Sequence, residues 1–486
     1  MDLAMNDDVS KQPFVGRMEQ FNALDRELDR IRNNNSHQRG KAIFMSGRRR
    51  IGKSRLVDEF CRRSGLPYVF FTASRQGDNE VELFTQDVAE STLAGREVFE
   101  GSRPQTWEAA LRLLATVLDD DTPTIVVIDE FPYLVETDQT IEATFQKNWD
   151  RRLSAKPILL ILIGSDLAMM EALNTHGRAL FQRGIDIIVP PLSPTETAKF
   201  VGSASPADSF DAHILTGGLP LICDEWPRGN SLWQYLEDAL RHPTSALIVS
   251  AERVLRAEFP SDTHAYNVLG EIGHGEVTFS KIARAGGGSN AASLNRSLDI
   301  LTRKRIVSRE VPLSTQPSKE ARYRVTDSYL RFWLRFIGPH MPEIERGRAE
   351  LVLARIKRDW TTWRGKAVEP LMREALLRMP SIGDAATPAA IGGFWTRSNN
   401  PEVDLVGADR SPIADHIAFV GSIKWLENNP IEQADINQLI ANAPKIPGVD
   451  HSTRLVAVSR TSVPARSVLR KTLTVIEPKD LLKAWK

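Results

Sequence analysis

Cysteine is nearly absent from this sequence. Cys61 and Cys223 are the only two in 486 residues, and they lie far apart along the chain. A disulfide framework and a cysteine-rich zinc module are therefore excluded. The nine histidines form no HxxxH or HxH cluster, so they predict no zinc site either.

Long apolar runs are also missing. The longest, PILLILIG at residues 157–164, is far shorter than the ~20 residues that span a bilayer. The polar and acidic start, MDLAMNDDVSKQ, lacks the charged-then-apolar pattern of a secretion signal. No membrane association is expected, and the expected compartment is the cytoplasm.

Neither sign of charge is in excess. The 62 basic and 62 acidic residues give a net charge of zero, which removes the simplest argument for nucleic-acid binding but leaves a local basic face open. Hydrophobic residues at 42% and charged residues at 26% are ordinary for a folded globular protein. A chain of this length predicts about three domains.

Short apolar runs alternate with amphipathic helical stretches through the first part of the chain. Continuous apolar runs fit strands that are buried on both faces of a parallel sheet. The runs are KAIFMS (41–46), YVFFTA (68–73), TIVVID (124–129), PILLILIG (157–164) and IDIIV (185–189). Helical patterns lie between them at 54–64, 81–93, 107–118 and 140–153. This alternation predicts a doubly wound α/β layer.

The octapeptide after the first predicted strand fits GxxxxGK[ST] in full. It consists of Gly47, Arg48, Arg49, Arg50, Ile51, Gly52, Lys53 and Ser54. Between a strand and a helix, such a loop turns its backbone N–H groups toward phosphate oxygens. Lys53 is expected to bridge the β- and γ-phosphates of ATP, and the Ser54 hydroxyl to bind Mg²⁺. The alternative is a glycine-rich turn with a surface lysine. No catalytic role is assigned to the three arginines.

Two later strands end in polar residues that complete such a site. Asp129 is predicted to hold Mg²⁺ and Glu130 to act as general base on the attacking water. Alternatively, both are exposed acids at a strand end. Ser165, at the tip of the next strand, is a candidate to hydrogen-bond the γ-phosphate, although Ser165 or Asp166 could equally cap the following helix.

These motifs resemble the archaeal-type ATPase family, a branch of the AAA+/STAND-like P-loop NTPases. The matching segments are FVGR (14–17), GRRRIGKS, IVVIDEFPYL, IGSD, LFQRGIDIIVPPLS, TGGLP, YRVTD (323–327) and LRFWLRF (330–336). The last two are similar to the family's winged-helix region and its junction with a C-terminal domain often labelled the DEXX-box ATPase C-terminal domain. The resemblance covers nearly the whole chain after Lys11.

The resemblance implies further site residues. Phe14–Arg17 would lie near the adenine. Arg183 would reach a γ-phosphate, in cis or from a neighbouring subunit, or would only form a surface ion pair. Gln182 stands where the family usually has glycine. Pro220 belongs to a turn that would carry nucleotide status to the helical domain, or that would simply break a helix.

The predicted fold class is α/β: a parallel P-loop NTPase sheet with a helical lid, then a winged helix and a small α/β restriction-endonuclease-like domain. The expected segments are a flexible N-terminus (1–13), the ATPase domain (14–192), the helical lid (193–256), the winged helix (257–336), a helical connector (337–360) and the C-terminal domain (361–486). The predicted helices of the winged helix are 264–273, 278–284 and 289–304, followed by a two-stranded hairpin around STQPSKE.

The last of these helices, Ser289–Lys304, would be the recognition-type helix. It carries Arg296, Arg303 and Lys304 but also Asp299, so both DNA binding and protein packing stay open. The aromatic stretch Tyr329–Phe336 has helical spacing and predicts an interdomain core.

The C-terminal segment resembles the PD-(D/E)xK nuclease core. Glu369 on a helix, Asp404 on a strand and Lys424 on the next strand match its pattern. Ser422 occupies the place of the second acid, which would help to hold Mg²⁺, and Glu402 lies one pleat away from Asp404. We therefore expect a degenerate nuclease fold that binds DNA or a protein without cutting.

The leading functional hypothesis is an ATP-hydrolysing, nucleotide-dependent switch with ATP and Mg²⁺ as cofactors, in a DNA-related or defence process. One alternative is an ATP-gated DNA-processing effector with a nuclease-fold tail. Another is a DNA-binding regulator with little turnover. Candidate partners are DNA through the winged helix or C-terminal domain, an unidentified protein, and further copies of the chain.

Overall fold

A computed structural model of the chain describes residues 14–33, 39–75, 79–259, 263–273, 275, 277–285, 290–464, 467 and 469–485. These residues form two compact units, Met1–Pro191 and Leu192–Lys486. The predicted N-terminal segment 1–13 lies outside the described residues.

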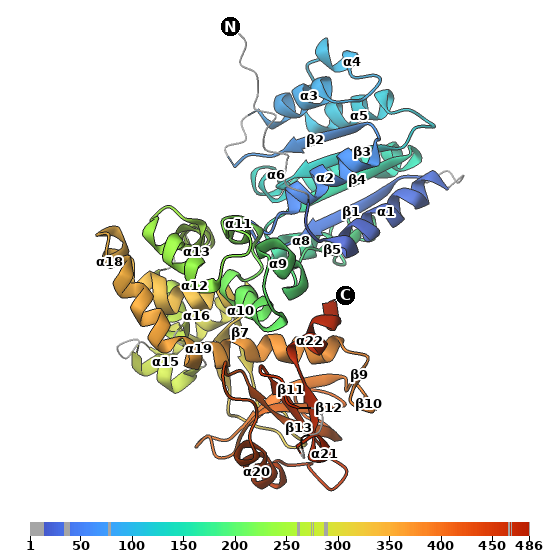
Figure 1. Cartoon of the computed structure of the whole chain (residues 1–486). Helices are drawn as coiled ribbons and strands as arrows, with labels where there is room; N and C mark the ends of the chain where they lie inside the picture. The colour runs from blue at the N-terminus through green and yellow to red at the C-terminus, as the bar shows by residue number, and fades with distance from the viewer. Residues whose placement is uncertain are drawn as a thin grey trace. The chain divides into compact units, whose positions relative to one another are not determined.

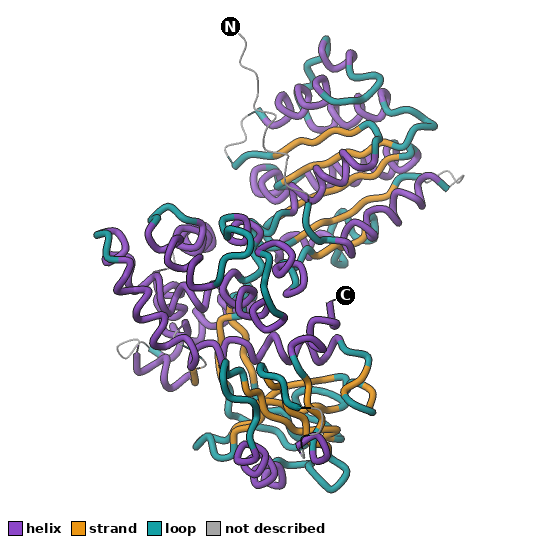
Figure 2. The backbone as a smooth tube through the Cα atoms, in the orientation of Figure 1, coloured by secondary structure: helices purple, strands orange, loops and turns teal. Residues whose placement is uncertain are grey.

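The first unit is built on one parallel sheet (Figures 1 and 2), whose strand order is β2-β3-β4-β1-β5. Its strands are β1 (Lys41–Ser46), β2 (Tyr68–Thr72), β3 (Thr124–Asp129), β4 (Ile158–Gly164) and β5 (Ile185–Ile188). Its helices are α1 (Met18–Arg32), α2 (Lys53–Ser64), α3 (Glu80–Glu90), α4 (Glu97–Glu100), α5 (Trp107–Val117), α6 (Phe131–Thr137), α7 (Ile141–Arg151) and α8 (Leu167–Leu173), with a 3₁₀ turn at Leu153–Ala155. The α/β class and the five strands are confirmed.

The central strands are buried on both faces, as their continuous apolar runs predict. Every residue of β3 and β4 is buried. Val126, Ile128 and Leu160 belong to a core cluster with side chains of α3, α5, α6 and α7. Side chains alternate between the two faces of a strand, so Ile125 and Ile161 pack on the opposite face. Because these strands run parallel, the carboxyl ends of β1, β3 and β4 meet at one edge of the sheet.

The second unit begins with a group of helices that matches the predicted helical segment. They are α9 (Pro194–Val201), α10 (Pro206–Thr216), α11 (Pro220–Asp224), α12 (Leu232–Arg241) and α13 (Ala246–Glu258). Ser193 and Ser231 form capping boxes that start α9 and α12. Gly217 and Gly218 both have a φ of 63°, in the left-handed region that ends α10.

The predicted winged-helix region contains three helices and a small antiparallel sheet of order β6-β8-β7. Its elements are α14 (Thr263–Gly273), β6 (Val277–Thr278), α15 (Phe279–Ala285), α16 (Ala291–Arg303), β7 (Val307–Glu310) and β8 (Arg322–Val325). The sequence predicted a two-stranded hairpin, and β6 adds a third strand. Ser289, the expected start of the recognition-type helix, lies outside the described residues.

The insert between β7 and β8 is not an exposed loop tip. Leu313 is buried in the core of the C-terminal sheet. Its N–H donates to Gly393 O (2.9 Å), and Ala414 N–H donates to Ser314 O (2.9 Å). Thr315 N–H donates to Pro447 O (3.2 Å). The segment that would form the wing of a winged helix is therefore part of the C-terminal sheet's packing.

The C-terminal sheet has the order β11-β12-β13-β14-β15, antiparallel from β11 to β13 and parallel from β13 to β15. Helices α19 and α20 pack against it. The remaining elements of this unit are α17 (Ser328–Phe332), a π-helix (Trp333–Ile337), a 3₁₀ turn (Gly338–His340), α18 (Met341–Glu345), α19 (Ala349–Arg378), β9 (Ser381–Ile382), β10 (Ala385–Ala386), β11 (Ala390–Trp395), β12 (Glu402–Ala408), β13 (Ile417–Lys424), α20 (Gln433–Asn442), a 3₁₀ turn (Ala443–Lys445), β14 (Arg454–Ser459), α21 (Leu469–Thr472), β15 (Thr474–Ile476), α22 (Pro478–Leu481) and a 3₁₀ turn (Leu482–Trp485).

The expected boundary after residue 360 does not coincide with the end of a helix. The sequence separates a connector (337–360) from a C-terminal domain (361–486), yet α19 runs as a single helix of 30 residues through this point. The reason is aromatic packing: Trp360 and Trp363 both contact the ring of Phe332. No helix among the described residues is long and apolar enough to cross a membrane.

Candidate nucleotide-binding site

The loop between β1 and α2 has a backbone that its residue types require. Gly52 (φ 87°) and Arg50 (φ 64°) both take left-handed conformations, which curl the loop. A Cβ on Gly47 would lie 2.7 Å from Val189 O, so only glycine fits there. The loop thus packs against the end of β5 and leads directly into the N-terminus of α2.

Lys53 lies buried in this loop and closes it. Its Nζ donates to Gly47 O (2.9 Å) and Arg48 O (3.2 Å). Burial lowers the pKa of Lys53, and the nearby carboxylates of Glu130 and Asp129 oppose the lowering. The two acceptors of Lys53 in these hydrogen bonds are backbone carbonyls. A buried cation with such neutral partners is suited to bind phosphate oxygens.

Ser54 and Asp129 meet across the carboxyl edge of the sheet. The Ser54 hydroxyl donates to Asp129 Oδ2 at 2.6 Å. Burial raises the pKa of Asp129, and this hydrogen bond opposes the rise. A hydroxyl and a carboxylate that converge in this way fit Mg²⁺, which is normally held by one or two carboxylates together with phosphate oxygens.

Glu130 follows Asp129 in a left-handed conformation (φ 52°). Its N–H donates to Asp129 Oδ1 (2.9 Å), and its Oε2 accepts from the Ser165 hydroxyl (3.0 Å). β4 lies between β3 and β1, so Ser165 is placed beside the general-base candidate. Asp166, rather than Ser165, caps α8 by accepting from Met169 N–H (2.9 Å). A contact of Ser165 with the γ-phosphate stays a prediction.

The similarity of this chain to known proteins covers more than the loop between β1 and α2. A model of the family DUF234, described as archaeal and bacterial proteins of unknown function, matches residues 333–438. An uncharacterized protein of Methanocaldococcus jannaschii is 24% identical over 92% of this chain and 95% of its own length. A second uncharacterized protein of that organism is 31% identical over 18% of this chain and 79% of its own. These matches support the resemblance of the chain to archaeal-type P-loop ATPases.

Two solved structures are also similar to this chain. The Walker-type ATPase of Pyrococcus abyssi has 18% identity and a TM-score of 0.46, over 66% of this chain and 96% of its own. The Aeropyrum pernix ORC2 protein has 13% identity and a TM-score of 0.46, over 71% of this chain and 98% of its own. Both TM-scores lie below 0.5.

Arg17, expected near the adenine, is buried beneath the loop between β1 and α2. Its guanidinium donates to Ile51 O (2.9 Å) within the loop and to Pro190 O beyond β5. Phe14, from the same segment, packs edge-on against Phe21. The two hydrogen bonds therefore connect the loop to the segment after β5 through Arg17. The proximity of Arg17 to adenine stays a prediction.

Arg183 is placed in an ion pair. Its Nε and Nη2 donate to the two carboxylate oxygens of Asp150 at 2.8 and 2.7 Å, and this pairing raises the pKa of Arg183. Gln182, where the family usually has glycine, takes the left-handed conformation (φ 59°) that glycine favours. Its N–H donates to Asn174 Oδ1 (3.0 Å), which supports the turn. The surface-pair alternative describes the present geometry, and the catalytic role stays untested.

Pro220 begins α11 in the second unit. The turn before it is tightly packed, since a Cβ on Gly218 would lie 2.3 Å from Leu192 O. Leu192 N–H donates to Gly218 O (2.9 Å). The turn is thus attached to the first residue of its unit, and the signalling role of Pro220 stays a prediction.

The nuclease-like residues each have a different partner. Asp404 Oδ2 accepts from the Ser422 hydroxyl (3.0 Å) and from Ile423 N–H (2.9 Å). Lys424 pairs with Asp435 (2.6 Å), and Glu369 pairs with Lys366 (3.0 Å). Within the described ranges, no group of three His, Cys, Asp or Glu side chains could hold a metal ion.

The recognition-type helix α16 keeps an exposed face that includes Asn295, Arg296, Asp299 and Arg303. DNA binding through this face stays a prediction. A contribution from the wing is disfavoured, because the insert is engaged by the C-terminal sheet. Arg322 of β8 is also engaged, by Glu402 (3.0 Å) and by the Trp395 ring (4.4 Å to the centroid).

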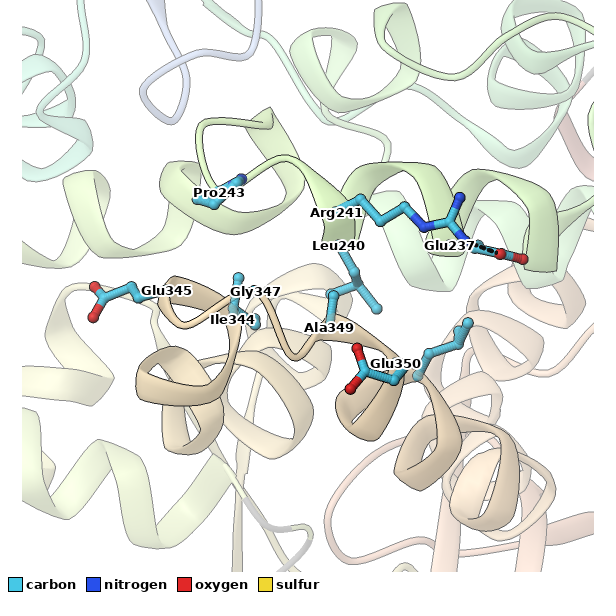
Figure 3. A pocket seen from close by; sticks show the side chains of 10 residues that line it. Glu237, Leu240, Arg241, Pro243, Ile344, Glu345, Gly347, Ala349 and Glu350 are labelled. Atoms are coloured by element: carbon cyan, nitrogen blue, oxygen red, sulfur yellow. Dashed lines mark hydrogen bonds and ion pairs between the residues drawn. The ribbon is translucent and has the colours of Figure 1, made fainter.

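A groove of about 280 Å³ lies between α12 and the α18–α19 segment (Figure 3). Glu237, Glu345 and Glu350 line it, and Arg241 is already paired with Glu237 at 2.6 Å. Acidic side chains repel phosphate groups. The groove is therefore no candidate for a nucleotide or a nucleic acid.

Two features of the nucleotide site could not be found from the motifs. Tyr133 accepts a hydrogen bond from Arg49 of the loop (3.1 Å). Arg17 reaches a carbonyl 173 residues away. The only signal in the sequence was that both residues belong to segments resembling the family.

Proposed function

We propose that this chain hydrolyses ATP and acts as a nucleotide-dependent switch. The observation that carries the proposal is the 2.6 Å contact between Ser54 Oγ and Asp129 Oδ2, with Glu130 following immediately in the chain. This arrangement supports metal-assisted hydrolysis, since a magnesium-ligand pair and a general base stand at one sheet edge.

Each residue has a defined task in this reaction. Lys53 binds oxygens of the β- and γ-phosphates, and Glu130 accepts a proton from water as the water oxygen bonds to the γ-phosphorus. The bond from the γ-phosphorus to the bridging oxygen breaks, which leaves ADP and phosphate. Mg²⁺, held by Ser54 and Asp129, would offset negative charge on the phosphates. Ser165 orients Glu130 through their 3.0 Å hydrogen bond.

The switch part of the proposal rests on how the loop is connected along the chain. Arg17 joins Ile51 O of the loop to Pro190 O. Two residues later, Leu192 N–H donates to Gly218 O in the turn before Pro220. A loop rearrangement that depends on the γ-phosphate would thus act on the segment that leads into the turn.

The test compares three forms of the full chain. Glu130→Gln should bind ATP and hydrolyse it at least ~100-fold more slowly, the scale of losing a general base. Lys53→Ala should lose nucleotide binding. Arg62→Ala is the matched control, because Arg62 is exposed at the far end of α2 and paired with Glu59 and Asp58.

Hydrogen exchange distinguishes a switch from a simple ATPase. In Glu130→Gln, ATP but not ADP should change amide exchange across residues 214–224. Wild-type turnover in Glu130→Gln would refute the assignment of the base. Equal exchange with ATP and ADP would refute the switch and leave the ATPase standing.

A further inference from the structure

Arg49 joins the loop to the helix that follows Glu130. Its Nη2 donates to the Tyr133 hydroxyl at 3.1 Å. Tyr133 lies in the first turn of α6, and its N–H donates to Glu130 O (2.9 Å). One short segment therefore fixes both the general-base candidate and the direction of the arginine.

The partner of the Arg49 guanidinium, the Tyr133 hydroxyl, carries no charge. In the part of the chain that the structure describes, no carboxylate lies within ion-pair distance of its guanidinium. Arg49 is close enough to Lys53 to contribute to the lowered pKa of that lysine. Two cations held near each other repel, and an anion that binds between them relieves the repulsion. The loop is thus prepared for a highly charged anion.

Tyr133 limits the directions available to this guanidinium. Its ring packs against the core of the first unit, and the Arg75 guanidinium lies 5.9 Å from the ring centroid. A tyrosine that is held by packing offers its hydroxyl at a fixed point. The long Arg49 side chain consequently loses less conformational freedom when it binds a ligand.

Arg183, the arginine favoured by the family resemblance, is in the opposite situation. Its two hydrogen bonds to Asp150 would have to break before these nitrogens could bind a phosphate. Arg49 needs no such rearrangement, since a neutral hydroxyl is a weaker partner than a carboxylate.

We propose that Arg49 is the arginine that binds the γ-phosphate in cis, and that Tyr133 is its positioning residue. This inference rests on the proposed ATPase function. As the water oxygen bonds to the γ-phosphorus and the bond to the bridging oxygen breaks, Arg49 donates hydrogen bonds to γ-phosphate oxygens. The water proton goes to Glu130, and the negative charge of the transition state is shared with Arg49.

The experiment uses the full chain with Arg49→Ala, Arg49→Lys and Tyr133→Phe, beside Arg62→Ala as control. We expect Arg49→Ala to lower kcat at least ~1,000-fold, the lower end of the range for arginines that act on a γ-phosphate. Affinity for a non-hydrolysable ATP analogue should fall, while affinity for ADP stays within about twofold because ADP lacks the γ-phosphate. Arg49→Lys should recover part of the loss.

Tyr133→Phe tests the positioning role, since it removes only one hydroxyl. We expect kcat to fall about tenfold, the scale of one hydrogen bond to a charged group, with KM unchanged. The double variant Arg49→Ala with Tyr133→Phe should be no slower than Arg49→Ala alone.

The outcomes separate this inference from the function on which it rests. A wild-type chain that binds no nucleotide overturns both. A wild-type chain that hydrolyses ATP, with Arg49→Ala equal to it in kcat and in preference for the ATP analogue over ADP, overturns the inference alone. A large loss in Arg183→Ala with none in Arg49→Ala would return the role to Arg183.

Discussion

Replacing Arg17 by methionine should lower the free energy of unfolding of the first unit. It should also abolish the effect of ATP on residues 214–224 of the second unit. The guanidinium is buried and donates to Ile51 O and Pro190 O. Methionine keeps most of the side-chain volume but provides no donor. Both carbonyls then lose a charged partner in a place where water has little access.

The size of the effect follows from these two hydrogen bonds. Each hydrogen bond from a charged donor contributes about 1.5–3 kcal/mol. The free energy of unfolding of the first unit should therefore fall by about 3–6 kcal/mol in the absence of nucleotide. Saturating ATP should restore part of this loss, because a ligand that binds only the folded state stabilises it.

Amide exchange in β1 and β4 is the suitable assay, since it reports the first unit without assuming that the whole chain unfolds in one step. Arg30→Met is the matched control: Arg30 lies on α1, the helix that Arg17 precedes, is 63% exposed and pairs with Glu27. Because the Arg30 side chain is mostly exposed to solvent, we expect its pair to contribute less than about 1 kcal/mol. Equal effects of the two substitutions would refute the reasoning. So would an ATP-dependent change in residues 214–224 that survives Arg17→Met.

Two further predictions concern the second unit. His213 is partly buried, and burial lowers its pKa to about 4. The unfolded chain therefore binds more protons between pH 4 and an ordinary pKa of about 6.5, so stability should fall by about 3 kcal/mol as the pH drops through that window. His213→Gln should flatten this dependence in urea titrations, and an unchanged slope would contradict the assignment. Ser422 leaves Asp404 without a second acid, so plasmid DNA should stay intact with Mg²⁺ or Mn²⁺; cleavage that Asp404→Ala abolishes would contradict this.

Short-range motifs carried most of the sequence-based predictions about the candidate nucleotide site. The loop from Gly47 to Ser54 lies in one continuous stretch, and so does the Asp129-Glu130 pair. Apolar runs marked all five strands of the first sheet within one or two residues. In β3 and β4 the runs are continuous because both faces of these strands are buried. The meeting of Ser54 and Asp129 then followed from parallel topology alone.

Packing between distant segments accounts for two differences between the sequence-based predictions and the structure: the position of the insert between β7 and β8, and the length of α19. The insert between β7 and β8 is polar except near Leu313, and its sequence resembles an exposed loop. Only the core of the C-terminal sheet provides the place that buries Leu313. In the same way, α19 continues past residue 360 because Trp360 and Trp363 contact Phe332, and no local signal records that contact.

The sequence by itself determined the α/β class, the loop from Gly47 to Ser54 and the acidic pair at the end of β3, because each depends on neighbouring residues and on a regular hydrophobic period. Tertiary structure alone decided that Arg49 contacts Tyr133 and, among the described residues, forms no ion pair with a carboxylate, whereas Arg183 pairs with Asp150. Arg49 and Tyr133 are 84 residues apart, and Arg183 and Asp150 are 33 apart. Ion pairs and hydrogen bonds over such separations depend on where the folded sheet places its strand ends, and the three adjacent arginines of the loop are alike until that placement distinguishes them.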